Sequence, residues 1–205
     1  MRITSHPLRG PSAAEALQAA PALNTRFRSH LRFVEPGDAA FICRLRADST
    51  PFRRAAPPSE LTTQRRWIER YKSRQAAGLE FYFVIVSEAR NRGLIRLYDF
   101  RDIAGEPSFR WGNWAIQPPV PASLVIFSAI TMHELGFNTL GYPRAHVTVP
   151  RANGGLLDFH LRAGADLEFE DADNLHFCYR PAGAANFRAR EAAATDMHRP
   201  MVVPA

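Results

Sequence analysis

The sequence predicts a mixed α/β (α+β) fold, with a mostly antiparallel central sheet of six to seven strands and about four flanking helices. Three observations support this fold class. The chain has 205 residues, which suits one domain and is too short for two ordinary ones. Hydrophobic residues make up 46% and charged residues 22%, the balance of a globular protein and not of a disordered chain. Segments with the composition of strands alternate with segments of helical periodicity.

In the first part of the chain the sequence predicts one short strand and two helices. Residues 30–34 alternate weakly, as a short strand does. A helix is expected from Asp38, which can serve as its N-cap, to Leu45. Residues 49–58 contain three prolines, which predict a loop. A second helix is predicted over 62–77, where aromatic residues recur one helical turn apart.

The strongest strand signal lies at 81–86, a run of aromatic and β-branched residues. A polar turn follows it, and 93–98 is the expected antiparallel partner. The remaining elements are a strand at 109–116, a helix at 122–139, a strand at 144–149, a helix at 154–163 and a strand at 174–180. The order is therefore β-α-α-β-β-β-α-β-α-β, with both crossover helices in the second half.

The two ends of the chain are expected to lie outside the domain. Residues 1–26 contain several prolines and predict a mobile N-terminal extension, in which 12–20 would form one or two helical turns at most. Residues 182–205 are rich in Ala and Arg with little apolar periodicity, which predicts a mobile or loosely docked C-terminal tail. A single domain is therefore expected over 27–181.

Composition and charge exclude several classes of function. The formal net charge is +6, but positive residues alternate with acidic ones, so nucleic-acid binding is not favoured. No run of about 18 apolar residues exists, which argues against a membrane-spanning helix. Cys43 and Cys178 lie far apart in the sequence and predict neither a disulfide framework nor a four-ligand zinc site. We therefore expect no metal, and a reduced, cytoplasmic compartment.

Three segments carry a more specific pattern. They are Leu140–Asn153, Phe159–Ala165 and Ile116–Pro118. Their order and spacing resemble the GCN5-related N-acetyltransferase (GNAT) family, and the resemblance covers residues 31–181. The aromatic pair Trp67 and Tyr71 resembles the helix that lies near the acceptor in the ribosomal-protein-acetyltransferase-like branch of that family.

The resemblance implies an enzyme that moves an acetyl group from acetyl-coenzyme A (acetyl-CoA) to a primary amine by direct attack. The acceptor would be a small molecule or a peptide, and a homodimer is left open. The implied donor-binding residues are Ala115, Ile116, Gln117, Val120, Ala122, Ser123, Leu124, Asn153 and Phe159. The implied acceptor-binding residues are Trp67, Tyr71, Arg96 and Trp111. His160 stands where the family commonly has a tyrosine that acts as the acid, and an imidazole titrating near neutrality could replace it.

The sequence departs from the family in two features. The family's pyrophosphate loop reads Gln/Arg-x-x-Gly-x-Gly/Ala, whereas residues 117–124 contain no glycine and three prolines, which have no N–H to donate. No carboxylate occurs at 109–116, where many members place the base, so a water relay or a different group is implied. Two alternatives therefore stay open: a catalytically inactive GNAT-like binding domain, and an acyltransferase with a different acyl donor.

Some of these residues also have structural interpretations. Asn153 is expected to cap the helix that follows it. His146 is interpreted mainly as a half-buried structural histidine, although it alternates with Thr148 on a strand that could face the acceptor. Trp111 and Trp114 lie three residues apart, so they are expected on opposite faces of their strand.

Overall fold

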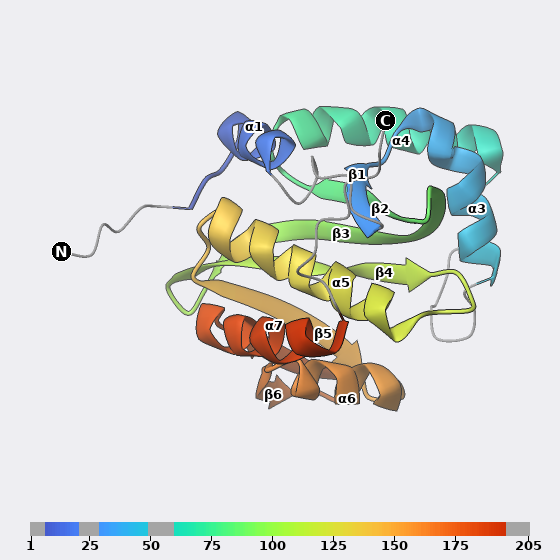
Figure 1. Cartoon of the computed structure of the whole chain (residues 1–205). Helices are drawn as coiled ribbons and strands as arrows, with labels where there is room; N and C mark the ends of the chain where they lie inside the picture. Colours follow the sequence, from blue (N-terminus) through green and yellow to red (C-terminus); the bar gives the residue numbers. More distant parts are fainter. Residues whose placement is uncertain (1–6, 21–28, 49–59, 196–205) are drawn as a thin grey trace.

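The computed structural model of this chain describes residues 7–20, 29–48 and 60–195. Within them one mixed sheet of seven strands runs through the molecule, with helices on both faces (Figure 1). The predicted fold class is therefore confirmed. The loop expected at 49–58 lies outside the described residues.

The strands pair in the order β1-β2-β3-β4-β5-β7-β6, and every neighbouring pair is antiparallel except β4 and β5. Their bounds are β1 Ser29–Phe33, β2 Phe81–Ser87, β3 Arg90–Ile103, β4 Glu106–Ile116, β5 Arg144–Pro150, β6 Asp166–Glu170 and β7 Asn174–Tyr179. The only parallel pair joins β4 to β5 through the crossover helix between them, so the sheet changes direction at its centre.

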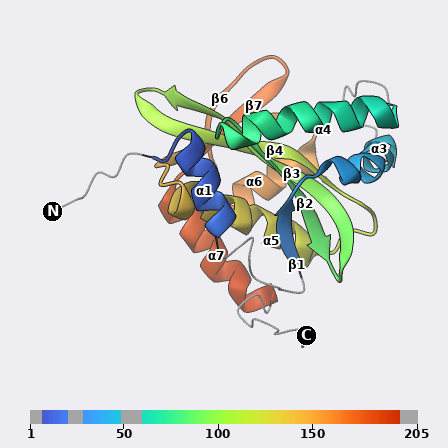
Figure 2. The ribbon, with the colours of Figure 1, turned by 90° about the horizontal axis from the view of Figure 1, so that it is seen from above.

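The helices form two layers. They are α1 Pro11–Ala19, α3 Ala39–Asp48, α4 Leu61–Ala76, α5 Ala122–His133, α6 Gly154–Arg162 and α7 Pro181–Thr195. A 3-10 turn, η1 (Pro36–Asp38), precedes α3, and a π-helical stretch, η2 (Glu134–Thr139), continues α5. Seen from above, α3 and α4 lie on one face of the sheet, while α1, α5 and α7 lie on the other (Figure 2).

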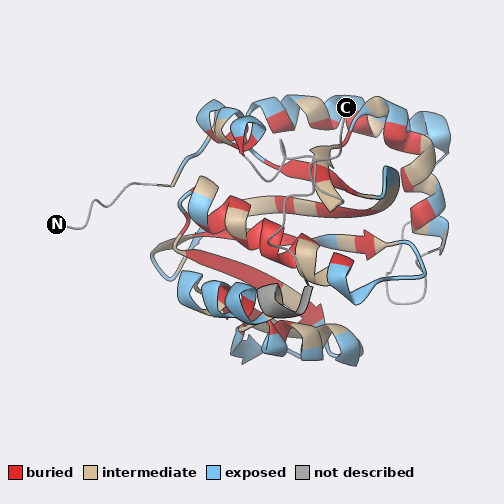
Figure 3. Ribbon diagram, viewed as in Figure 1, coloured by how far each residue is buried: buried red, intermediate tan, exposed pale blue. Residues whose placement is uncertain are grey.

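Two clusters of buried side chains correspond to these two layers. Figure 3 marks the buried residues in red along the sheet and on the helices that cover it. The larger cluster joins the sheet to α1, α5 and α7, and the smaller one joins it to α3 and α4. Side chains on β2 alternate between them, because successive residues of a strand point to opposite faces. Phe81, Phe83 and Ile85 enter the larger cluster, whereas Tyr82 and Val84 enter the smaller one.

The boundaries of 27–181 expected from the sequence leave out two helices that pack on this core. In α1, Leu17 is fully buried in the larger cluster. A Cβ at Gly78 would clash with the carbonyl oxygen of Gly10, so the start of α1 packs closely on the end of α4. In α7, Ala184 and Phe187 are buried in the same cluster. Helices α1 and α7 therefore pack on the same core as the elements between them.

Two further expectations need correction. Asp38 does not cap α3 but sits at the third position of η1, where its carboxylate accepts the N–H of Glu35 at 2.9 Å and pairs with Arg32. The edge strand β6 was not predicted from the sequence. All five of its residues are exposed, so it lacks the buried apolar alternation by which strands are recognised.

Candidate active site

The centre of the candidate site is the point where β4 and β5 separate. The two parallel strands pair at only three positions, the last being Arg110 with His146. Beyond this pair β4 carries a bulge: Arg96 of β3 faces Gly112, but Leu94 faces Ala115, so β4 has one extra residue. The extra residue leaves the ladder locally disrupted, and the remainder of β4 has no partner on the β5 side. We call the position of Arg110 and His146 the apex.

The bulge changes which side chains share a face. Asn113 has a positive φ of 49° within the bulge. As a result Trp111 and Trp114 lie on the same face, with ring centroids 5.6 Å apart, in contrast to the opposite faces expected from simple alternation. Trp111 is 2% exposed in the larger core cluster, and Trp114 packs against that cluster. Trp111 is therefore a core residue on the α5 and α6 side of the sheet.

The loop from β4 to α5 is exposed throughout 117–123. The N–H of Gln117 is already bonded to the carbonyl of Arg92 at 2.7 Å, and the N–H of Leu124 to that of Pro121 at 3.0 Å. No residue of the described chain accepts from the N–H groups of Val120, Ala122 or Ser123. These three unpaired donors surround the N-terminus of α5, whose dipole favours an anion.

The N-terminus of α6 lies at the carboxyl end of β5 and is the second helix start in this region. Asn153 caps it as predicted, since its side-chain oxygen accepts the N–H of Leu156 at 3.2 Å. Gly154 and Gly155 follow as the first two helical residues, and a Cβ at either would meet no atom within 4 Å. The first turn of α6 is therefore open to a ligand.

Aromatic side chains fill the space beneath the bulge. Phe159 of α6 packs on Trp114 at 5.2 Å, and His160 of α6 on Trp111 at 5.4 Å. His133 of α5 and Tyr179 of β7 complete this aromatic cluster, their rings 4.5 Å apart. The cluster couples β4, α5, α6 and β7 to one another.

His160 lies inside this cluster rather than at its surface. It is 4% exposed, and its Nδ1 is 2.7 Å from the hydroxyl of Tyr179. Burial lowers the pKa of His160 to about 4, so the imidazole is neutral at pH 7. The acid role expected for His160 stays a prediction, and the imidazolium form that would make it a strong donor is disfavoured here.

We expect the fold to lose stability steeply as the pH falls from 6.5 towards 4. Burial, with a smaller contribution from His160, also lowers the pKa of His133 to about 3, and no described residue pairs with either of its ring nitrogens. Both histidines bind protons more readily in the unfolded chain, where the pKa of each is near 6.5. The stabilisation that comes from keeping them neutral is therefore fully present above that pH. Below pH 6.5, each histidine should lower the free energy of unfolding by about 1.4 kcal/mol per pH unit, until the pH reaches the pKa of that histidine in the folded protein.

Urea unfolding at a series of pH values measures this loss. His133→Phe should flatten the acid limb, because it removes one titrating histidine while keeping a ring of similar size. His176→Gln on β7 is the matched control and should leave the limb unchanged between pH 6.5 and about 5, above the range in which its partner Asp171 titrates. A limb that is equally steep in His133→Phe would contradict the assignment.

The face of the sheet opposite the aromatic cluster carries polar side chains at the apex. His146 points to this face, with Nδ1 2.8 Å from the hydroxyl of Ser108 and Nε2 3.1 Å from the carboxylate of Asp99. His146 is 6% exposed, and side-chain exposure rises to 31% at Asp99, so the chain of contacts runs from the core to solvent. Burial lowers the pKa of His146 below 6.5, against the opposing effect of Asp99.

Arginines flank a tyrosine on the same face. The guanidinium groups of Arg96 and Arg110 lie 4.8 Å and 5.7 Å from the centre of the Tyr98 ring. Arg96 is also paired with Glu80, which Arg74 contacts at 2.7 Å, so the charge of Arg96 is partly compensated. Of the expected acceptor-binding residues, Arg96 is the one that lies on this face close to the apex.

Trp67 and Tyr71 lie further away, in the smaller core cluster. Tyr71 is 1% exposed, and its hydroxyl accepts the N–H of Tyr82 at 2.6 Å. Trp67 stacks on Tyr71 with ring planes 3° apart. Burial raises the pKa of Tyr71 well above its ordinary value, so the phenol stays neutral. Their contacts attach α4 to β2.

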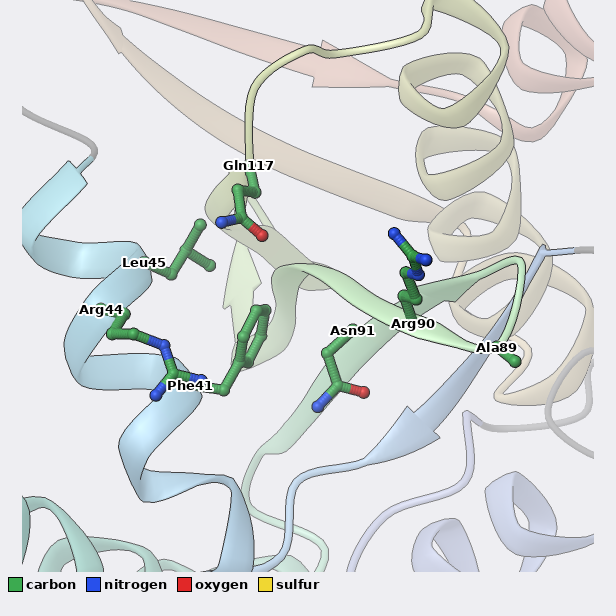
Figure 4. A pocket seen from close by; sticks show the side chains of 7 residues that line it. All are labelled: Phe41, Arg44, Leu45, Ala89, Arg90, Asn91 and Gln117. Atoms are coloured by element: carbon green, nitrogen blue, oxygen red, sulfur yellow. The ribbon is translucent and has the colours of Figure 1, made fainter.

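A groove opens between α3 and the β2–β3 hairpin, next to the end of β4 (Figure 4). Its volume is about 400 Å³, and it is lined by Phe41, Arg44, Leu45, Ala89, Arg90, Asn91 and Gln117. The two-residue turn of the hairpin, Glu88 and Ala89, has positive φ at both positions, the geometry of a tight type I′ turn. No carboxylate is among the described residues of the lining.

Sequence reasoning missed two of these features. The Asp99–His146–Ser108 chain draws one residue from each of three strands, and only their register brings them together. The groove likewise joins residues more than 70 positions apart. Of these residues, the sequence pattern indicated an orientation only for His146, because its alternation with Thr148 places both side chains on the same face of β5.

Comparison with known proteins identifies the family. The sequence model described as "Acetyltransferase (GNAT) domain" matches residues 28–166, more than half of the chain. The chain belongs to the GNAT acetyltransferase family. The separated strands β4 and β5 and the helix α5 that follows β4 are therefore features of an acetyltransferase fold. The comparisons do not assign the chain to one branch of the family. No curated protein sequence matches the chain.

Solved structures agree with this assignment. "Apo FdhC- a nucleotide-linked sugar GNAT" is 29% identical with a TM-score of 0.73, covering 92% of this chain and 98% of its own. A chimera of the spermidine N-acetyltransferase SpeG from Vibrio cholerae with hSSAT is 18% identical, with a TM-score of 0.62 over 78% of this chain and 99% of its own. A GCN5-related N-acetyltransferase from Brucella melitensis is 15% identical, with a TM-score of 0.62 over 82% of both chains. The latter two share the fold.

None of the helices among the described residues combines the length and the apolar character needed to cross a membrane. In the same residues no group of three or more His, Cys, Asp and Glu side chains is arranged to hold a metal ion.

Proposed function

We propose that this chain is an N-acetyltransferase that moves the acetyl group of acetyl-CoA to a primary amine of a small molecule. The observation that carries the proposal is the separation of β4 and β5 beyond Arg110 and His146, beside two helix N-termini. A separation of this kind leaves strand edges with unpaired backbone groups, which an extended amide-containing arm such as pantetheine can pair with.

Acetyl-CoA would be held by backbone groups more than by side chains. Its pyrophosphate would accept from the N–H groups of Val120, Ala122 and Ser123 at the start of α5. The pantetheine arm would run along Ala115 and Ile116 toward the apex, with the first turn of α6 on its other side. The glycine-free loop thus keeps three usable donors, although Gln117 and Leu124 have their own N–H groups engaged.

The acceptor class that we favour is an amine carried on a nucleotide-linked sugar. The solved structure that is 29% identical over 92% of this chain is titled a nucleotide-linked sugar GNAT. A polyamine, the acceptor named for the spermidine enzymes, is cationic and would be repelled by the arginines near the apex and in the groove. An anionic acceptor would be attracted by them.

The chemistry requires the amine to lose a proton as its nitrogen attacks the thioester carbon. The new C–N bond forms, the C–S bond breaks, and the departing thiolate takes up a proton. We propose that the Asp99–His146 pair accepts the amine proton through a water, because it lies at the apex with its carboxylate partly exposed. Ser108 would hold the imidazole in place.

The alternative function is a binding domain that has lost catalysis. The absence of glycine from 117–124 and of a carboxylate from 109–116 favours it. The two functions differ in whether acetyl-CoA binds and is turned over in the presence of an amine.

Calorimetric titration of acetyl-CoA into the protein at low salt tests the proposed donor. We expect micromolar affinity, since three free N–H groups at a helix start and a separated strand pair are available. Ser123→Pro should weaken binding at least about tenfold by removing one donor, whereas Ser123→Ala should change it little. Absence of heat and of thermal stabilisation at millimolar acetyl-CoA would overturn the proposal in favour of a binding domain or another acyl donor.

A further inference from the structure

We propose that the groove of Phe41, Arg44, Arg90 and Gln117 binds the diphosphate of a nucleoside diphosphate-linked acceptor. The inference rests on the proposed function, because it names the acceptor that the apex would acetylate. It also assigns that acceptor a site on the opposite face of the sheet from the start of α6.

The groove presents cationic groups that have no partner in the described chain. The guanidinium group of neither Arg44 nor Arg90 forms an ion pair or a hydrogen bond with any described residue. Other arginines on this domain are paired, among them Arg32 with Asp38 at 2.6 Å and Arg180 with Glu106 at 2.7 Å. Two guanidinium groups that no described residue pairs with, on either side of a concave surface, are suited to a multiply charged anion.

Hydrogen bonds hold the β2–β3 hairpin and the β4–α5 loop in place beside the groove. Asn91 is held by Arg32, which donates to its side-chain oxygen at 3.1 Å. Arg92 donates to the carbonyl of Pro119 at 2.7 Å and accepts from the N–H of Gln117 through its own carbonyl. The hairpin and the β4–α5 loop are thus tied together. Gln117 remains exposed, so its amide can donate to a ligand.

The groove also offers an apolar contact. Phe41 is half-buried and, with Leu45, lines the α3 side of the groove opposite Arg90 (Figure 4). An aromatic ring next to arginines is a combination that suits a nucleobase next to phosphates, because a base can stack on the ring. The lining therefore favours a nucleoside diphosphate over a simple anion.

The position of the groove matches an acceptor that reaches the apex. Arg44 and Leu45 belong to α3, on the face to which His146 and Arg110 also point. Gln117 follows β4 and lies seven residues beyond Arg110, roughly 20 Å along the chain at about 3.3 Å per residue with the bulge shortening it. A sugar attached to a diphosphate held between Arg44 and Arg90 would therefore extend from the groove along β4 toward the apex.

The groove and the donor site use the same loop but different faces. The free N–H groups of Val120, Ala122 and Ser123 surround the start of α5, which covers the other face of the sheet. A phosphate of coenzyme A is the other source of the same chemistry, so the experiment must separate donor from acceptor.

Calorimetric titration of thymidine diphosphate, uridine diphosphate and inorganic pyrophosphate at low salt tests this inference. We expect one of the nucleotides to bind more tightly than pyrophosphate. Arg44→Ala and Arg90→Ala should each weaken the nucleotide about tenfold, with the affinity for acetyl-CoA unchanged. The control Arg188→Ala removes an equal charge from α7 on the opposite face, and should change nucleotide affinity less than about twofold.

Each other outcome overturns the inference. An equal loss of acetyl-CoA affinity in the two arginine variants would assign the groove to the donor. If pyrophosphate binds as tightly as both nucleotides, the groove does not recognise the nucleoside. If neither nucleotide binds at millimolar concentration, the groove is not a nucleotide site. Failure of acetyl-CoA to bind would instead refute the proposed function, and nucleotide binding that depends on Arg44 and Arg90 would still be observed.

Discussion

Replacing His146 by glutamine is expected to lower kcat about a hundredfold, with little change in the affinity for acetyl-CoA. General base catalysis contributes a factor of this order or more. The side chain lies at the last pair of β4 and β5, and its Nε2 is 3.1 Å from Asp99. Glutamine keeps the hydrogen-bonding capacity for Ser108 and Asp99 but cannot take up a proton at neutral pH.

The pH profile provides a readout that a merely structural role would not change. Burial lowers the pKa of His146 from 6.5, so its imidazole is neutral at pH 7 and available as a base. As the pH falls below 6.5, protonation should reduce kcat in the native protein. This limb should disappear in His146→Gln, leaving only the titration of the acceptor amine. Asp99→Asn should reproduce the loss of activity, because it removes the carboxylate that contacts Nε2 of His146.

His176→Gln is the matched control. His176 on β7 also contacts an aspartate, Asp171, at 2.7 Å, but it lies near the edge of the sheet and not at the apex. It should keep full activity. Unaltered kcat in both His146→Gln and Asp99→Asn would contradict the proposed base, and circular dichroism would show whether each variant is folded.

Much of the architecture could be predicted because residues that favour strands are concentrated in short continuous segments of this chain. Residues 81–86 are buried on both faces, which requires the continuous apolar run that the sequence shows. Asn153 was predicted as a cap because a cap depends on local sequence alone. Helix α7 could not be predicted in the same way, since among its described side chains only Ala184 and Phe187 belong to the core cluster.

The site was less predictable because it depends on register. One extra residue at Asn113 turns Trp114 to the face of Trp111, and no composition signal marks that bulge. The pairing of Asp99 with His146 depends on a further irregularity in β3, between Tyr98 and Arg101. Family resemblance located the donor loop, but the faces of the central strands could be read only from the structure.

Replacing Trp111 by alanine is expected to lower the free energy of unfolding by about 3–5 kcal/mol, the cost of truncating a large buried aromatic side chain. Trp111 is 2% exposed and contacts Trp114, His133, His160 and Tyr179. Such a loss is a large part of the 5–15 kcal/mol by which a typical domain is stable. Trp111→Phe should cost less, because it preserves most of the ring contacts.

Urea unfolding followed by circular dichroism separates this core role from the acceptor-binding role expected of Trp111 from the sequence. A binding residue on an open surface would change acceptor affinity and alter stability by less than about 0.5 kcal/mol. Trp67→Ala is the matched control, since Trp67 is only half-buried and should cost less than Trp111→Ala. Because Trp111 packs on α5, α6 and β7 at once, its loss would also loosen the helix starts proposed to hold acetyl-CoA. Reduced donor affinity should therefore accompany reduced stability, and a variant that loses acceptor binding alone would refute the core role.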